Sequence, residues 1–116
     1  ARALCGVDAT ARMLERHGGT TVVVPHIGAD EFAEYEALLD RFPTLWLDTT
    51  MTLGGYFPKG PDIGILARRS ERLLYGTDFP NIPYAWDREM KVLAAARMTR
   101  DALAAIAGGN AARLFG

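Results

Sequence analysis

The chain has 116 residues, of which 49% are hydrophobic and 23% are charged, and its formal net charge at pH 7 is −1. This composition is typical of a single globular domain and argues against nucleic acid or an anionic membrane surface as the principal partner. No apolar run approaches the about 20 residues that cross a bilayer, and the single Cys5, which cannot form an internal disulfide, favours a cytoplasmic location.

The first half of the chain alternates helical and strand-like patterns. Apolar residues at helical spacing predict a helix from about Val7 to His17, and the β-branched run Thr20–Val24 predicts a buried strand. A second helix is expected from about Asp30 to Phe42, where Pro43 stops it, followed by a short strand at Leu45–Leu47. Alternation of this kind predicts crossover connections and a parallel sheet.

The second half continues the alternation and then becomes helical. The connection Met51–Gly60 is longer than an ordinary strand-to-helix loop, so a functional loop is expected there. A third helix is predicted from about Pro61 to Arg69, and Leu73–Tyr75 is predicted as the third strand. The remaining predicted elements are helices at about Ala85–Met98 and Arg100–Ala107, the latter capped by Thr99, and a last turn Ala111–Phe115 capped by Asn110 after a break at Gly108-Gly109.

Three residues with chemically active side chains each lie just past the end of a predicted strand: His26, Asp48 and Asp78. Crossovers in a parallel sheet share one hand, so the carboxyl ends of the strands fall on one rim and these side chains should gather there. Imidazole and carboxylate are ligands for Zn²⁺ or a similar divalent ion, and also general acids and bases. The structural alternatives are a histidine bonded to a backbone carbonyl and turn aspartates. We expect Asp48 taken alone to be structural, in a turn with Thr49 and Thr50, whereas the three residues together favour a functional site.

Four motifs carry a resemblance to a known family. They are Val22-Val-Val-Pro-His26-Ile-Gly28, Leu45-Trp-Leu-Asp48-Thr-Thr50, Tyr75-Gly-Thr-Asp78-Phe-Pro80 and Gly109-Asn-Ala-Ala-Arg-Leu-Phe-Gly116. In this order they resemble the amidohydrolase-related metal-dependent hydrolases of TIM-barrel fold, the branch that includes the aminocarboxymuconate-semialdehyde decarboxylase type. The resemblance implies an α/β fold that is the C-terminal part of a (β/α)8 barrel, with strands six to eight and their helices in residues 1–116 as a single, incomplete domain.

The resemblance also implies roles for individual residues. Asp78 would be the strand-eight aspartate, which binds the metal and handles the proton of the attacking water, and His26 would be the strand-six histidine at the metal centre. The implied enzyme hydrolyses or nonoxidatively decarboxylates a small organic acid, amide or lactone, with Zn²⁺ as the expected cofactor. Tyr56, Phe57 and Tyr84, on loops of the same rim, are candidate substrate-binding residues; aromatic packing between loop and helix is the alternative.

The chain departs from that family in one large respect. The His-x-His pair of the family's first strand and the histidine of its fifth are absent, because the only histidines are His17 and His26. A whole barrel needs about 250 residues, and the chain begins at Ala1 without a methionine, so we expect a segment of a longer enzyme that lacks most metal ligands and has no metal-dependent turnover alone. Its expected partners are a small-molecule substrate and either a second copy or the missing strands.

Two other classes of function stay open. The first is a non-catalytic module, a truncated barrel whose open sheet edges pair with another chain. The second is an independent small doubly wound domain that binds a ligand at its strand ends without a metal. Elemental analysis for bound metal would distinguish the metal-dependent enzyme from the ligand-binding domain, and a dimer that pairs its edge strands would favour the non-catalytic module.

Overall fold

The computed structural model describes residues 2–116. In chain order the elements are α1 Arg2–Cys5, α2 Val7–Arg16, β1 Val22–Val24, the 3-10 turn η1 Pro25–Gly28, α3 Phe32–Arg41, β2 Leu45–Asp48, α4 Ile65–Arg68, the 3-10 turn η2 Ser70–Arg72, β3 Leu73–Leu74, α5 Arg88–Ala95, α6 Arg100–Ala104, the π-helical turn η3 Ala105–Gly109 and α7 Asn110–Phe115. Within this described range, no helix is both long and apolar enough to span a membrane.

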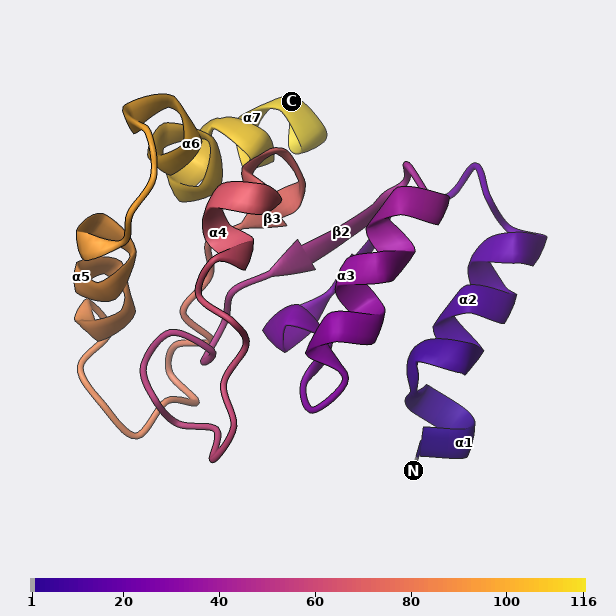
Figure 1. The fold of residues 1–116 in the computed structure, drawn as a ribbon, viewed down its shortest axis with the longest axis horizontal. Helices are drawn as coiled ribbons and strands as arrows, with labels where there is room; N and C mark the ends of the chain where they lie inside the picture. The colour runs from indigo at the N-terminus through magenta and orange to yellow at the C-terminus, as the bar shows by residue number, and fades with distance from the viewer. Residues whose placement is uncertain (1) are drawn as a thin grey trace.

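The three strands form one parallel sheet in the order β1-β2-β3, as the alternation of helices and strands predicted. Trp46 of β2 pairs with Val23 of β1, and Leu47 pairs with Leu73 of β3. Each connection between neighbouring strands contains a helix, α3 or α4, which lets the chain return to the same end of the sheet. The loops that follow β2 and β3 therefore extend from the same end of the molecule, below the sheet in Figure 1, while α6 and α7 lie at the other end.

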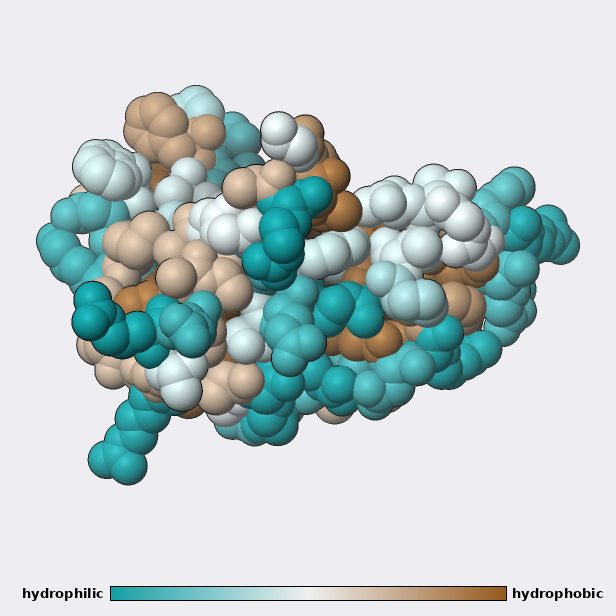
Figure 2. All heavy atoms as spheres, turned by 90° about the horizontal axis from the view of Figure 1, so that it is seen from above, coloured by the Kyte–Doolittle hydropathy of each residue, from teal (hydrophilic) through white to brown (hydrophobic). Residues whose placement is uncertain are grey.

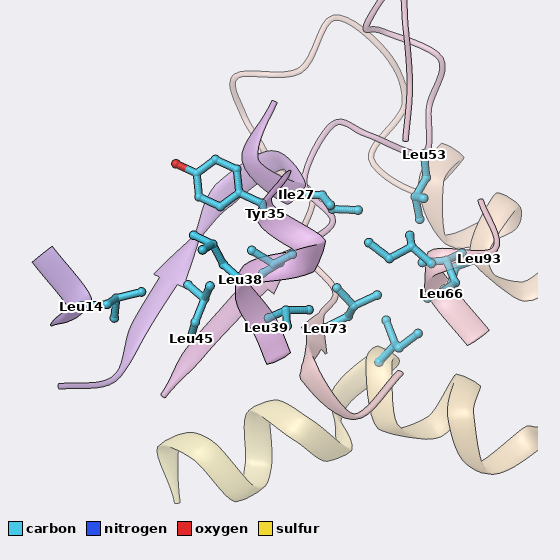
Figure 3. Close-up of a cluster of buried hydrophobic side chains, with 13 residues drawn as sticks. Leu14, Ile27, Tyr35, Leu38, Leu39, Leu45, Leu53, Leu66, Leu73 and Leu93 are labelled. Atoms are coloured by element: carbon cyan, nitrogen blue, oxygen red, sulfur yellow. The ribbon is translucent and has the colours of Figure 1, made fainter. Parts of the chain in front are cut away.

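One face of the sheet is covered by α3, and the main core lies between them. Leu38 and Leu39 of α3 point toward Leu45 of β2 and Leu73 of β3, and all four side chains are at most 5% exposed (Figure 3). Side chains alternate across a strand, so Trp46 lies on the opposite face, where it stays half-buried. On that same face, Leu74 of β3 is buried at 6% exposure.

The chain measures 38 × 30 × 25 Å along its principal axes. Seen from above in Figure 2, apolar residues are exposed among polar ones over the left half and near the middle of the view. Several large apolar side chains are exposed, including those of Phe79 and Trp86, which extend from loops after β3.

Backbone carbonyls at the amino ends of the strands are bonded by two polar side chains, the half-buried Arg72 and the buried Asn110. The guanidinium of Arg72 donates to the carbonyl oxygens of Leu39, Phe42 and Leu45. These bonds join the end of α3 to the start of β2. The last carbonyls of a helix have no partner within the helix, and Arg72 supplies donors for them. Arg72 thus links the chain before β3 to the turn between α3 and β2.

Asn110 plays a different part from the predicted one. It was expected to cap the last turn, which is wrong, because Asn110 is itself the first residue of α7 and Gly109 precedes it at the cap position. Its fully buried amide donates instead to the carbonyl oxygens of Ser70, at 2.6 Å, and Leu73, at 2.7 Å. The side chain therefore ties the C-terminal helix to the start of β3.

Other predicted boundaries also need correction. The strand expected from Thr20 begins at Val22, and the helix expected from Pro61 begins only at Ile65. Here the Asp62 carboxylate accepts the backbone N–H of Gly64 at 3.0 Å, a local bond that competes with helix formation. The helix expected over Ala85–Met98 is limited to α5. The predicted break at Gly108-Gly109 is confirmed, because Gly108 has a non-helical backbone (φ 180°, ψ −25°) within η3, where the chain kinks before α7. The cap at Thr99 is confirmed, since its hydroxyl accepts the N–H of Ala102.

Candidate functional site

The loop after each strand contains a residue other than glycine with a left-handed backbone. His26 after β1 has φ 59°, Met51 after β2 has φ 60°, and Asp78 after β3 has φ 62°. Side chains with a Cβ rarely adopt this conformation, and such residues gather where the surrounding structure holds them for a function. In a parallel sheet these three positions share the carboxyl rim, so the strained residues mark one edge of the sheet.

The His26 backbone is fixed by the end of the neighbouring strand. Asp48 Oδ1 accepts the His26 N–H at 3.1 Å, and the same oxygen accepts the N–H and the hydroxyl of Thr50 at 3.1 and 2.5 Å. The bond from Asp48 to the amide two residues on is an Asx turn. The structural role expected for Asp48 is confirmed with Thr50 as its partner, whereas the buried hydroxyl of Thr49 has no partner in the described structure.

Thr50 also fixes the proton of the His26 ring. Nδ1 of His26 lies 2.8 Å from the main-chain oxygen of Thr50 and 2.9 Å from its hydroxyl oxygen. A carbonyl oxygen only accepts, so in this geometry Nδ1 carries the hydrogen and donates it. The neutral ring then has its lone pair on Nε2. The histidine thus bonds a backbone carbonyl, as the structural alternative expected, and this same bond orients its second nitrogen for binding or proton transfer.

Asp78 forms its own tight turn at the end of the third strand. Its main-chain oxygen accepts the Asn81 N–H at 2.8 Å, and its Oδ1 accepts the Asn81 side-chain amide at 3.3 Å. The residue is half-buried at the carboxyl rim. Because β2 lies between β1 and β3, the strands that lead to His26 and Asp78 are about 10 Å apart. The sheet therefore places both residues on one rim and joins His26 directly to Asp48, not to Asp78.

The donors on this rim match a metal site in kind but not in number. An imidazole nitrogen with a free lone pair and a carboxylate are zinc ligands, and a catalytic zinc usually has three protein ligands. Among residues 2–116, no group of three or more histidine, cysteine or acidic side chains is arranged to hold a metal ion. His26 and Asp78 are two donors of the right kind, fewer than a catalytic zinc usually has.

The candidate aromatic residues lie on both loops of the rim. The ring of Phe57 is 5.9 Å from the His26 ring, and Tyr56, which is 53% exposed, meets Phe57 edge to face at 5.7 Å. Tyr84 instead packs inward, with its hydroxyl buried and the Arg88 guanidinium 5.1 Å from its ring centre. Burial, and then the negative charge of Glu89, raise the pKa of Tyr84.

Glu89 was not predicted from the sequence and is the most unusual polar residue near the rim. It lies on α5, is 1% exposed, and accepts backbone N–H groups from the loop after β2. The only local signal is an acidic residue four positions before the buried Leu93, on the apolar face of its helix. The sequence gives no sign of the loop amides that Glu89 binds.

Comparison with known proteins gives the family. The amidohydrolase family profile matches residues 7–116. An uncharacterised TIM-barrel protein from Bordetella bronchiseptica has a similar structure, with a TM-score of 0.77 and 25% identity over 93% of this chain and 38% of that one. Structures of an amidohydrolase from Burkholderia multivorans, one with HEPES and one with zinc bound, give TM-scores of 0.68 and 0.66 at 18% identity, over 92% of this chain and 48% of theirs.

The match covers most of this chain and a smaller part of its relatives. The chain spans 38% to 48% of the length of these solved structures, and its three parallel strands with their helices correspond to part of a TIM barrel. No curated protein matches the sequence. Since the family profile extends over nearly all of the described residues, the chain belongs to the amidohydrolase family.

Proposed function

We propose that this chain is the part of a metal-dependent hydrolase or nonoxidative decarboxylase that supplies one histidine and one aspartate to the metal centre. The observation that carries the proposal is the orientation of His26, whose Nδ1 is held by Thr50 so that Nε2 keeps the lone pair. Asp78 at the end of the next strand but one adds a carboxylate on the same rim. Family membership and the zinc found in one structural relative support the choice of metal.

Each residue has a distinct part in this proposal. His26 Nε2 and the Asp78 carboxylate would hold the metal, together with ligands from barrel strands that this chain does not contain. A divalent metal bound there lowers the pKa of water and polarises the substrate. Asp78, with one oxygen bonded to Asn81, would take the proton from the attacking water, as carboxylates do in general base catalysis. Phe57 and Tyr56 would face the substrate from the loop after β2.

Zinc binding by the chain itself tests the proposal. Zn²⁺ is titrated into the ¹⁵N-labelled protein while the imidazole nitrogens are followed by NMR. We expect weak binding that shifts Nε2 of His26, and a loss of affinity of about tenfold in His26→Ala and Asp78→Asn, as removal of a ligand interaction implies. The matched control is His17→Ala, which removes the other histidine, exposed at the end of α2, and should leave the affinity unchanged. Zinc that shifts only His17, or that binds His26→Ala as tightly, contradicts the proposal.

The open sheet supports a second candidate function, an interaction module. Within the described residues β1 and β3 each have one strand neighbour, so each leaves an edge whose backbone groups could pair with another strand. The occupants would be the missing strands of the barrel or a second copy of this chain. Sedimentation velocity over a concentration series distinguishes these cases: a dimer indicates a second copy, and a monomer that binds zinc favours the metal-centre proposal.

A further inference from the structure

The loop after β2 is bonded to a buried carboxylate on a helix far away in the sequence. Oε2 of Glu89 accepts the N–H of Met51 at 3.1 Å, and Oε1 accepts those of Leu53 and Gly54 at 2.8 and 2.9 Å. A charge that is 1% exposed is costly unless its oxygens are bonded, and here three donors serve two oxygens. The loop amides therefore offset the cost of burying the Glu89 charge, and the same hydrogen bonds fix the backbone of the loop.

This loop leaves few backbone groups free to move. Between the bonded amides, Thr52 turns back, and its N–H and hydroxyl both donate to the carbonyl oxygen of Thr49, at 3.0 and 2.7 Å. Gly54 fits closely, since a Cβ there would be 3.0 Å from the Tyr84 ring and 3.3 Å from Cγ of Glu89. Residues 49–54 are consequently fixed from two sides, by α5 and by the end of β2.

Thr50 is the residue through which this order reaches His26. The amide of the next residue, Met51, is bonded to Glu89, and the peptide group that contains this amide also contains the Thr50 carbonyl. That carbonyl oxygen is the acceptor for Nδ1 of His26. Because a peptide group is planar, holding its N–H sets the direction of its C=O. The left-handed φ of 60° at Met51 shows that the chain is held in a conformation it would not adopt freely.

We infer that Glu89 is a positioning residue for His26: by holding the Met51 N–H it orients the Thr50 carbonyl and so keeps the His26 ring proton on Nδ1. Two tyrosine hydroxyls, those of Tyr75 and Tyr84, are buried nearby without a partner in the described structure. The charge of Glu89 contributes, after burial, to raising the pKa of both. The inference rests on the proposed function only in treating His26 as part of the site.

The test is the tautomer of the His26 ring in Glu89→Gln, read from long-range ¹H–¹⁵N correlations at about pH 8.5, where histidine is neutral. Glutamine keeps one acceptor oxygen for Leu53 and Gly54 and places an NH₂ group against the Met51 N–H. We expect the share of the Nε2–H tautomer to rise at least threefold, and exchange of the Met51 amide to become about tenfold faster, as the loss of a charge-assisted bond implies.

Asn110→Ala is the matched control, because it also removes a buried side chain that binds the backbone, but at the amino end of the strands. It should lower stability without changing the His26 tautomer. If circular dichroism shows that Glu89→Gln is unfolded, Glu89→Asp, which draws the charge back by one methylene, is read in the same way. An unchanged tautomer in the folded variant, or an equal change in Asn110→Ala, overturns the inference, whatever the outcome of the zinc titration.

Discussion

Asp48 at the end of β2 accepts the backbone N–H of His26 at the end of β1, with 3.1 Å between Oδ1 and the amide nitrogen. The bond crosses from one strand end to the next, so the two loops cannot move independently. It also holds His26 in its left-handed conformation, which an unbonded chain would leave. One carboxylate oxygen thereby sets the backbone of the candidate site, while Thr50 sets its ring.

We expect Asp48→Ala to lower the free energy of unfolding by about 2–4 kcal/mol, because three donors lose their charged acceptor. Urea unfolding followed by circular dichroism measures the change. Asp48→Asn keeps an oxygen in the same place and should lose less than half as much. Equal losses of unfolding free energy in the two variants would show that the stabilisation does not come from hydrogen bonds to Oδ1.

Gly28 should tolerate no side chain. Its φ is +82°, and a Cβ would lie 2.0 Å from Cδ2 of Tyr35. Gly28→Ala should therefore cost about 2–4 kcal/mol through backbone strain and overpacking. Gly19→Ala is the control, since a Cβ there has nothing within 4 Å, and its effect should stay within about 0.5 kcal/mol. Thermal unfolding of both variants gives the comparison.

The hydrogen bonds of the Asn110 amide should contribute more to stability than the volume that the side chain fills. Asn110→Ala leaves the carbonyl oxygens of Ser70 and Leu73 without donors, and we expect a loss of about 2–3 kcal/mol. Asn110→Asp has nearly the same shape but, when ionised, has no hydrogen to donate, so it should unfold at least as easily as the alanine variant at pH 7. An aspartate variant as stable as the wild type would refute the assigned hydrogen bonds.

Stability should depend on pH through Glu36. The Arg68 hydrogen bond, opposed by burial and supported by Arg69, holds the pKa of Glu36 below its usual value of 4.5. A lowered folded pKa means that the ionised group stabilises the fold above pH 4.5 and that this contribution is lost as the pH falls through the folded value. Urea unfolding at pH 7 and about pH 3 should show a smaller drop for Glu36→Gln than for the wild type. Equal drops would contradict the ion pairs.

The sheet could be predicted because its signals are local. The β-branched run before Pro25 and the apolar runs at Leu45 and Leu73 indicate buried strands, and helices between them require parallel crossovers. The turn at Asp48 was predictable for the same reason, since an Asx turn involves only residues two apart. The three strands and the helices between them were therefore placed correctly, although their ends shifted where residues such as Asp62 bonded locally, and the short helix α1 at Arg2–Cys5 was not predicted.

The contacts that build the site depend on distant residues, which the sequence does not encode locally. Glu89 lies 38 residues from Met51, and no spacing rule links a helix acid to loop amides. Asparagine is a residue type that often caps helices, but Asn110 is buried and binds the carbonyl oxygens of Ser70 and Leu73, so tertiary packing determines its role. The tautomer of His26 likewise depends on a main-chain oxygen, an atom that every residue has.

Arg72 and Asn110 satisfy backbone carbonyls where the strands begin, whereas Asp48 and Glu89 bind backbone amides where strands end. The two tasks are thus assigned to opposite poles of one small sheet. Substitutions around the first pole that keep the hydrogen bonds of Arg72 and Asn110 could be screened for higher thermal stability without touching the candidate site. Residues around the second pole could then be varied in search of new activity, because the added stability would offset the loss of stability that such substitutions cause.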